Sequence, residues 1–398
     1  MRHVKKSLMA VVALALLLSL AGCMGKFLSG LTLGGPGECS TNCPPTPAFL
    51  YASSPDHVSA LSINQTTGAL GPALEMAGPN QSTGMTAPVS LGRLYVSDFV
   101  NDTVQGFSIN SNTGGLTAIA GSPFPLSGTA PGAGGLSASV SGGAYLYATD
   151  LNAGEVDGFA FDSATGKLTA VPGSPFAVGN TPVQAVQAGL QGKFLYVSNL
   201  NDPVGGISAF TIDFNTGSLT PIPGSPFATG ASGTFPGPSA LVTTDSFLYV
   251  ALAGTANANN KIVAFSIDQS SGILTPIVGS PFVTGSDPLY MALVPVTNKF
   301  LFTANVQDNT ISVFAVDGTS GLLAPVSGSP FPAGTSVGGL AISPIAAPTG
   351  NYFLYAANPQ GNAISGYTID GSTGNLSPIS GSPFAAGNSP ALLAVVVP

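Results

Sequence analysis

Short runs of aromatic and aliphatic residues recur along the chain, each followed by a loop, a second apolar run and a glycine-containing turn. In the clearest copy, Phe194–Val197 (FLYV) and Ile207–Ile212 (ISAFTI) show no alternation with polar residues. Continuous apolar runs of this length indicate strands that neighbouring sheets cover on both faces. The segment between them is rich in Asn, Asp, Pro and Gly, which favour loops. We therefore expect two buried strands, which we name B and C.

A turn and another extended run follow strand C. In Asp213–Leu219 (DFNTGSL) the aspartate can cap the turn, and Gly217 can take the positive φ that a tight turn requires. The run LTPI then resumes the extended pattern. This pattern predicts a hairpin between strand C and a strand D.

The same unit recurs seven times, with a spacing of about 51 residues between Leu50 and Leu354, which is typical of the blades of a β-propeller. Every copy has the turn after strand C, and all but the first end in Gly-Ser-Pro-Phe. The first copy has Gly78-Pro79-Asn80 instead. Strand B begins at Phe49, Arg93, Tyr145, Phe194, Phe247, Phe300 and Phe353, and the Gly-Ser-Pro-Phe motif begins at Gly121, Gly173, Gly224, Gly279, Gly328 and Gly381.

A fourth apolar run, strand A, lies between each of these motifs and the next strand B. The first unit has no such run before Phe49, whereas the C-terminal Ala391–Val397 (ALLAVVV) has no unit of its own. The C-terminal strand is therefore expected to pair into the first blade, which removes a free sheet edge. The prediction is an all-β, seven-bladed β-propeller over residues 48–398 with four-stranded blades. The other runs are MTAPVSL, LSASV, VQAVQAGL, SALVTT, MALVPV and LAIS.

The first 22 residues have the pattern of an export signal. Arg2, Lys5 and Lys6 precede an apolar core, residues 8–20, that is too short to span a bilayer. The sequence Leu-Ala-Gly-Cys that ends at Cys23 resembles the bacterial lipobox. That resemblance implies lipidation of Cys23, removal of residues 1–22, and a lipid-anchored protein of the cell envelope, at the outer membrane or on the periplasmic or cell surface. The alternative is an ordinary signal peptide with an incidental cysteine.

Residues 23–47 are rich in Gly, Pro and Ser and predict a tether. Its Cys39 and Cys43 are expected to form a local disulfide after export, so no cysteine remains as a nucleophile. The chain has no Trp, is 7% charged and has a formal net charge of −8. Loss of the basic signal would make it more negative still. This charge disfavours nucleic acid as a partner.

The strand sequences FLYVSN and ISAFTID, the TG-x-L turn and the Gly-Ser-Pro-Phe spacing resemble the seven-bladed lactonase family, which includes 6-phosphogluconolactonase-like proteins and YVTN-type surface propellers. The resemblance covers residues 49–398 and implies the propeller fold. It also implies lactone hydrolysis, although a fold hosts several functions.

Topology assigns the charged residues to the two faces of the ring. The B-to-C and D-to-A loops emerge on one face, which we name the ligand face. A phosphosugar needs Arg or Lys, which this face nearly lacks, so a phosphorylated substrate is disfavoured. Arg93, Lys167, Lys193 and Lys299 fall on the opposite face, whereas the ligand face has Lys261 with Asp56, Asp98, Asp102, Asp150, Glu155, Asp202, Asp287 and Asp308.

Two constellations could carry chemistry. His57 follows Asp56 and could be a general base that the carboxylate orients, or simply a solvated loop histidine. Asp102, Asp150, Asp202 and Asp308, each beside or near an Asn, could bind calcium, or could be ordinary turn residues.

Three functions remain. A binding or scaffold module, with a small-molecule, glycan or protein ligand at the channel face, needs no catalytic residues and is the prediction. The alternatives are a metal-assisted lactonase acting on an unphosphorylated lactone, and a structural envelope protein.

Overall fold

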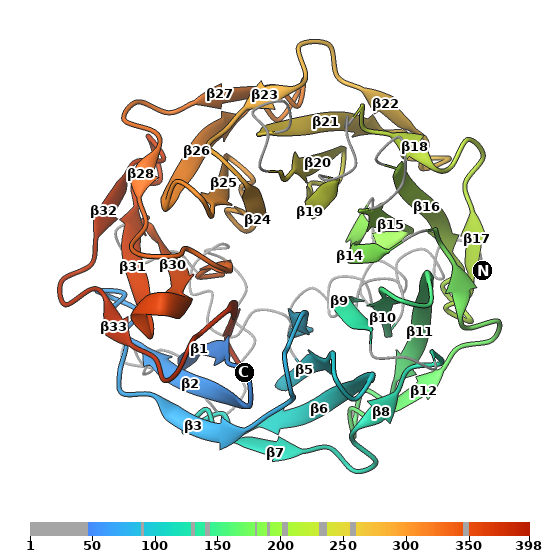
Figure 1. Ribbon diagram of the computed structural model, residues 1–398, viewed down its shortest axis with the longest axis horizontal. Helices are drawn as coiled ribbons and strands as arrows, with labels where there is room; N and C mark the ends of the chain where they lie inside the picture. The colour runs from blue at the N-terminus through green and yellow to red at the C-terminus, as the bar shows by residue number, and fades with distance from the viewer. Residues whose placement is uncertain are drawn as a thin grey trace, which may run out of the picture. The chain divides into compact units, whose positions relative to one another are not determined.

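The computed structural model describes residues 47–88, 91–128, 132–139, 144–179, 181–188, 192–200, 206–230, 237–254, 260–344 and 350–398. The predicted signal, the tether and all three cysteines lie outside these residues. The unit Thr46–Pro398 is a seven-bladed β-propeller, with seven sheets arranged in a ring around a central channel (Figure 1). The fold prediction is confirmed. Among the described residues, no helix is long and apolar enough to cross a membrane.

Each blade has four strand positions, which run from A at the channel to D at the rim. Strand A is β34 (Leu392–Val396), β4 (Met85–Thr86), β9 (Ala133–Ser139), β14 (Pro182–Ala188), β19 (Pro238–Thr243), β24 (Pro288–Leu293) and β29 (Leu340–Ile342) in blades 1 to 7. Strand B is β1 (Ala48–Ser53), β5 (Arg93–Asp98), β10 (Tyr145–Asp150), β15 (Phe194–Asn199), β20 (Phe247–Leu252), β25 (Phe300–Asn305) and β30 (Tyr352–Asn358).

Strand C is β2 (His57–Ile63), β6 (Thr103–Ile109), β11 (Glu155–Phe161), β16 (Gly206–Ile212), β21 (Lys261–Ile267), β26 (Thr310–Val316) and β31 (Ala363–Ile369). Strand D begins with β3 (Leu74–Ala77), β7 (Leu116–Ala118), β12 (Leu168–Ala170), β17 (Leu219–Pro221), β22 (Leu274–Pro276), β27 (Leu323–Pro325) and β32 (Leu376–Pro378). A short 3₁₀ helix, η2 (Pro359–Gly361), lies between β30 and β31.

The Gly-Ser-Pro-Phe motif divides strand D in two. From the Phe of the motif onward, a second short strand pairs with the start of strand C, so these six blades have five-stranded sheets. Blade 1, which lacks the motif, has the single strand β3 and a four-stranded sheet. The sequence analysis treated D as one strand, and this detail was missed. The second pieces are β8 (Phe124–Pro125), β13 (Phe176–Ala177), β18 (Phe227–Ala228), β23 (Phe282–Val283), β28 (Phe331–Pro332) and β33 (Phe384–Ala385).

The C-terminal strand completes blade 1 as predicted. Strand β34 pairs antiparallel with β1, with Leu50 opposite Val395, and β1 pairs with β2 on its other side. The C-terminus lies beside these strands in Figure 1. Several boundaries of strand A differ from the prediction: in blade 2 the strand was placed at Met85–Leu91, whereas β4 ends at Thr86, and in blade 6 it was placed at Met291–Val296, whereas β24 is Pro288–Leu293. Pro295 has no N–H to donate to a ladder, so the strand stops before it.

Strand B forms the buried layer of every blade. All six residues of β1, β10, β15, β20 and β25 are buried. Hydrophobic clusters join strands of adjacent blades, such as Tyr196 of blade 4 with Leu248 of blade 5. Burial on both faces explains why these strands are apolar runs without polar alternation.

Candidate functional site

The central channel contains a cavity of about 450 Å³. All seven blades contribute to its wall, mostly with the first residues of strand A or the residues just before it, so the cavity lies towards the ligand face. The described lining residues include Gly, Ala, Ser, Leu and Met, with Gln184 and Tyr290. None of them is Asp, Glu, Lys, Arg or His. Burial, and then the nearby Asp287, raise the pKa of Tyr290, so this phenol is neutral at neutral pH.

Polar side chains of the cavity wall bond to neighbouring blades. Thr83 donates its hydroxyl to the carbonyl of Ala133, and Ser239 Oγ donates to Pro288 O at 2.8 Å. Gln184 Oε1 accepts from the backbone N–H of Leu241 at 2.6 Å. By contrast, Ser82 Oγ is buried and has no hydrogen-bond partner among the described residues. Tyr290 also lines the cavity and offers a hydroxyl to a ligand, whereas the buried Ser82 Oγ becomes available only once the atoms that cover it move.

The predicted ligand-face residues that the structure describes lie at the B-to-C loops or at the strand ends beside them, except Asp287, which lies in the D-to-A loop before β24. Several of these side chains form hydrogen bonds that hold the loops in place. Asp98 is 1% exposed and accepts hydrogen bonds from Asn101 N, Asn101 Nδ2 and Gln105 Nε2. Asp308 Oδ2 accepts from Ser286 N at 2.6 Å. Lys261 begins β21. Asp98, Asp308 and Lys261 therefore do not indicate one shared site.

A pair of polar side chains links adjacent blades on the ligand face. It consists of the last residue of strand B and the third residue of strand C, and we name it the junction pair. In blades 4, 6 and 7 it is an Asn with a Ser, joined by hydrogen bonds of 2.7–2.8 Å. The Asn also bonds to the D-to-A loop of the preceding blade, as when Asn358 Nδ2 donates to Ala333 O at 2.8 Å. The three pairs are Asn199–Ser208, Asn305–Ser312 and Asn358–Ser365.

Blade 3 has two aspartates at the junction pair. Asp150 is fully buried and Asp157 is 3% exposed. Burial, above all, raises the pKa of Asp157 to about 6, with smaller contributions from Asp150 and Glu155, although hydrogen bonds from Ser127 lower it. Burial, followed by the charges of Asp150 and Asp157, likewise raises the pKa of Asp102 to about 6. Asp102 and Asp150 were candidate calcium ligands in the sequence, with turn residues as the alternative, whereas Asp157 was not singled out.

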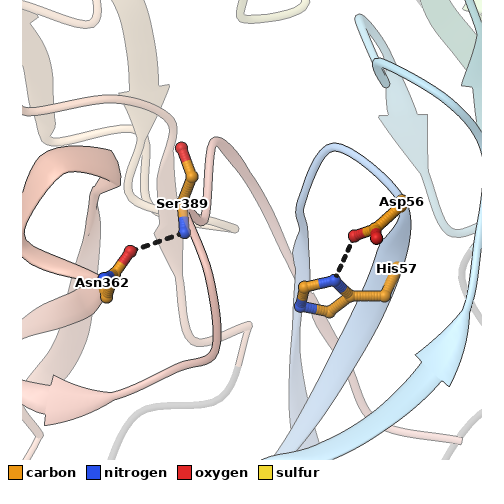
Figure 2. Close-up of polar contacts among 4 residues, drawn as sticks. All are labelled: Asp56, His57, Asn362 and Ser389. Atoms are coloured by element: carbon orange, nitrogen blue, oxygen red, sulfur yellow. Dashed lines mark hydrogen bonds and ion pairs between the residues drawn. The ribbon is translucent and has the colours of Figure 1, made fainter.

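His57 is not a solvated loop residue, so that interpretation of the sequence is wrong. It is the first residue of β2, and its side chain is 14% exposed. Its Nδ1 lies 2.7 Å from Asp56 Oδ1, as Figure 2 shows. Its Nε2 is buried and without a hydrogen-bond partner among the described residues.

The blade 7 loop explains this burial. Gly387 lies so close that a Cβ there would stand 2.9 Å from His57 Nε2, 3.2 Å from Ser59 Oγ and 2.7 Å from Glu75 Oε1. The loop is held in place on its own blade, where Asn362 Oδ1 accepts from Ser389 N at 2.8 Å (Figure 2). The imidazole thus lies at the junction of blades 7 and 1, with its Nε2 beside a buried serine and a carboxylate.

The calcium prediction gains no support from the described residues. Among them, no group of three or more His, Cys, Asp or Glu side chains is arranged to hold a metal ion. Asp202 lies outside the described residues, and so do Cys23, Cys39 and Cys43. Sequence reasoning also missed Ser59, Glu75 and Tyr290. Aligning the seven B-to-C segments would have revealed the unusual acids of blade 3, but no sequence signal marks the contact with Gly387.

Comparison with known proteins agrees with the fold. The family model described as "Lactonase, 7-bladed beta-propeller" matches residues 137–338. No curated protein matches the chain. A putative 6-phosphogluconolactonase from Bacteroides fragilis is 19% identical, with a TM-score of 0.70 over 90% of this chain and 100% of that one. The periplasmic gluconolactonase PpgL of Pseudomonas aeruginosa is 17% identical, with a TM-score of 0.67 over 89% and 100%. At these identities the structural likeness shows the fold alone.

Proposed function

The chain belongs to the seven-bladed β-propeller lactonase family, and from that premise we propose that it is a lipid-anchored, exported binding propeller whose central cavity takes a small, uncharged molecule of the lactone or sugar-ring class. The observation that carries this proposal is the cavity wall, which encloses about 450 Å³ and has no Asp, Glu, Lys, Arg or His among its described lining residues.

The size and chemistry of the wall select the ligand class. A volume of a few hundred Å³ suits a small organic molecule. Apolar Leu and Met side chains can cover a ring, while the hydroxyl of Tyr290 can bond to its oxygens. A phosphate would enter this cavity without an Arg or Lys to pair with, and burying an unpaired charge is costly. The proposed ligand is therefore unphosphorylated.

The relatives support the class of ligand. One structural neighbour is a periplasmic gluconolactonase and another a putative 6-phosphogluconolactonase. The predicted export signal favours the first comparison, and so does the absence of Lys and Arg from the described lining of the cavity.

Isothermal titration calorimetry with the protein lacking residues 1–46 tests this proposal. Glucono-1,5-lactone should bind, and its 6-phosphorylated form should bind at least tenfold more weakly. Tyr290→Phe should weaken binding of the unphosphorylated lactone by about fivefold to tenfold, the value of one hydrogen bond. Tyr352→Phe, at the opposite end of a blade, is the matched control and should bind normally. Tighter binding of the phosphorylated form would contradict the proposal.

Hydrolysis of a lactone at the junction of blades 7 and 1 is the second candidate function, and the contact between Asp56 and His57 favours it, because His57 lies at that junction and is not among the described residues that line the central cavity. The carboxylate holds Nδ1 at 2.7 Å and leaves Nε2 without a partner among the described residues, as a general base requires. A pH-stat assay should then show turnover above the spontaneous rate, and His57→Gln should lower it by about 100-fold or more. Binding without turnover by the unmodified protein would rule out hydrolysis of that lactone and leave the binding function.

The lipid anchor has its own test. Cys23→Ser should release the protein from the membrane fraction or block removal of residues 1–22, because the thiol is the proposed site of lipidation. Fractionation and mass measurement of the mature N-terminus would check this. A Cys23→Ser protein that matures normally and stays with the membrane would contradict the anchor.

A further inference from the structure

We propose that Asp102 and Asp157, which lie with Asp150 in one carboxyl cluster, bind protons and thereby make the junction between blades 2 and 3 sensitive to pH, so that the junction is tight when they are protonated and weakened when they ionise. The proposal is independent of the ligand of the central cavity.

Comparison of the blades within this one chain carries the argument. Asn–Ser pairs occupy the junction-pair positions in blades 4, 6 and 7, and in blade 2 Gln105 Nε2 donates to Asp98 Oδ2 at 3.2 Å. In each of these pairs a donor faces an acceptor. Blade 5 has the apolar Leu252 and Val263. Only in blade 3 do two carboxyl groups share the position. Two carboxylates cannot satisfy each other, so at least one needs a proton or another donor.

The geometry leaves buried oxygens without donors. Asp157 Oδ1 accepts from Ser127 Oγ at 2.7 Å and from Ser127 N at 3.1 Å, whereas its Oδ2 has no partner among the described residues. Asp150 Oδ1 accepts from Ala153 N at 3.1 Å, and its Oδ2 likewise has no partner there. Both residues are at least nine-tenths buried.

Asp102 of blade 2 joins the pair beneath Gly128. A Cβ on Gly128 would stand 2.0 Å from Asp150 Oδ2 and 3.0 Å from Asp102 Oδ2, so both oxygens are directed at one point. In other loops the glycine one position earlier lies over the Asn of the next blade, as Gly334 lies over Asn358, whereas Ser127 takes that position before Gly128. The loop contact is therefore repeated around the ring, and what differs in blade 3 is its charge.

No described strand around the cluster supplies a cation to balance it. Strands β4, β6, β8, β9, β13 and β14 contain no Lys, Arg, His, Asp or Glu. Strand β11 adds Glu155, which lies opposite Asp150, and β5 ends in Asp98. Arg93 is at the other end of β5. Since three acidic side chains are not arranged to hold a metal ion here, the charge is best balanced by protons.

The direction of the pH effect follows from the raised pKa values. Asp102 and Asp157 both have a pKa of about 6 in the folded protein, against 3.8 ordinarily. Between a pH of about 4 and about 6, the folded state therefore keeps protons that the unfolded state has already released. The free energy of unfolding falls as pH rises through this range. Above that range both groups are ionised and the full cost of the buried charge remains.

Melting temperature measured between pH 4.5 and 8 tests the cluster. The variant Asp150→Asn with Asp157→Ser rebuilds the Asn–Ser pair of blades 4, 6 and 7. It should melt at least about 2 °C higher than the unmodified protein at pH 7.5, and that advantage should shrink or reverse at pH 5. Asp308→Asn, an acidic ligand-face residue outside the cluster, is the matched control and should keep the pH profile of the unmodified protein.

Two further measurements distinguish a wrong proposal from a variant that fails to fold, and a bound proton from a bound metal ion. If the double variant fails to fold, Asp102→Asn alone should reduce the same pH dependence, because it removes one of the two titrating groups. An unchanged pH dependence in the cluster variants would overturn the proposal. So would a calcium-induced rise in melting temperature at pH 7.5 that the unmodified protein shows and the double variant lacks, because a metal ion would then hold the cluster in place of the proton.

Discussion

A tyrosine hydroxyl in strand B ties each of six blades to the next one. In each case the buried phenol donates to the carbonyl of the glycine in the C-to-D turn of the following blade, at 2.6–3.0 Å. The series includes the closing contact, from Tyr355 of blade 7 to Gly68 of blade 1. Blade 6 has Phe302 at this position, so it lacks the bond. The tyrosines are Tyr51, Tyr95, Tyr147, Tyr196, Tyr249 and Tyr355.

Exchanging Tyr and Phe at these positions should shift stability in opposite directions. Tyr196→Phe leaves the carbonyl of Gly272 without its donor and should lower the free energy of unfolding by about 1 kcal/mol. Phe302→Tyr offers a hydroxyl at the one blade that lacks it and should be neutral or stabilising by a similar amount. Urea titrations of both variants measure this. A loss of stability in Phe302→Tyr as large as that in Tyr196→Phe would show that the hydroxyl does not fit blade 6.

At the scale of one element, the Gly-Ser-Pro-Phe motif interrupts strand D. Where the ladder is broken, strand C has a backbone N–H that no residue of D can bond. The serine of the motif accepts it in all six blades, for example Ser225 Oγ from Ala209 N at 2.9 Å. Blade 1 lacks the serine and has an unbroken β3. The motif thus has a structural role.

Removing that serine should cost more than removing an exposed one. Ser225→Ala leaves the N–H of the fully buried Ala209 unpaired, and should lower the free energy of unfolding by about 1–3 kcal/mol. Ser218→Ala is the control, because Ser218 Oγ bonds to Pro172 O at the surface and should contribute less. Chemical denaturation of both variants would compare them. Equal losses would mean that the buried N–H finds another partner.

Sequence reasoning recovered the elements whose signal is local. Apolar runs such as Phe194–Val197 are visible because strand B is buried on both faces, and Gly217 has the positive φ of 76° that its turn predicted. Features that depend on distant contacts were missed. Gly387 of blade 7 lies against the His57 imidazole of blade 1, and the role of Ser225 depends on an N–H in another strand. A single sequence shows such residues but not their neighbours.

For the molecule as a whole, the acidic residues are spread around the ring, and this bears on metal binding. Asp98 and Asp308 each bond within or beside their own loops, and the carboxyl cluster of blade 3 has no metal-binding arrangement. An ion that bound only the folded state would stabilise it. Among the described residues, no arrangement of acidic side chains indicates an ion on which the stability of the propeller would depend.

Removal of divalent ions should accordingly leave the propeller unchanged. Addition of a chelator in excess should shift the melting temperature by less than about 1 °C, and calcium should not raise it. Differential scanning calorimetry at pH 7.5 measures both. A chelator-induced drop that calcium reverses, and that Asp102→Asn with Asp150→Asn abolishes, would instead support the calcium site first considered from the sequence.

Closure of the ring itself is the property on which the whole molecule depends. Strand β34 covers the inner edge of β1, and its Leu393 and Val396 are buried against strands of blades 7, 1 and 2. Deleting residues 390–398 should expose this edge and the apolar residues beneath it, so the protein should aggregate or lose most of its thermal stability. Deleting Pro398 alone is the control, since it lies beyond β34 and should leave the melting temperature unchanged. If the longer truncation remained soluble with an unaltered melting temperature, the C-terminal strand would not stabilise the ring. The first blade would then be stable with three strands.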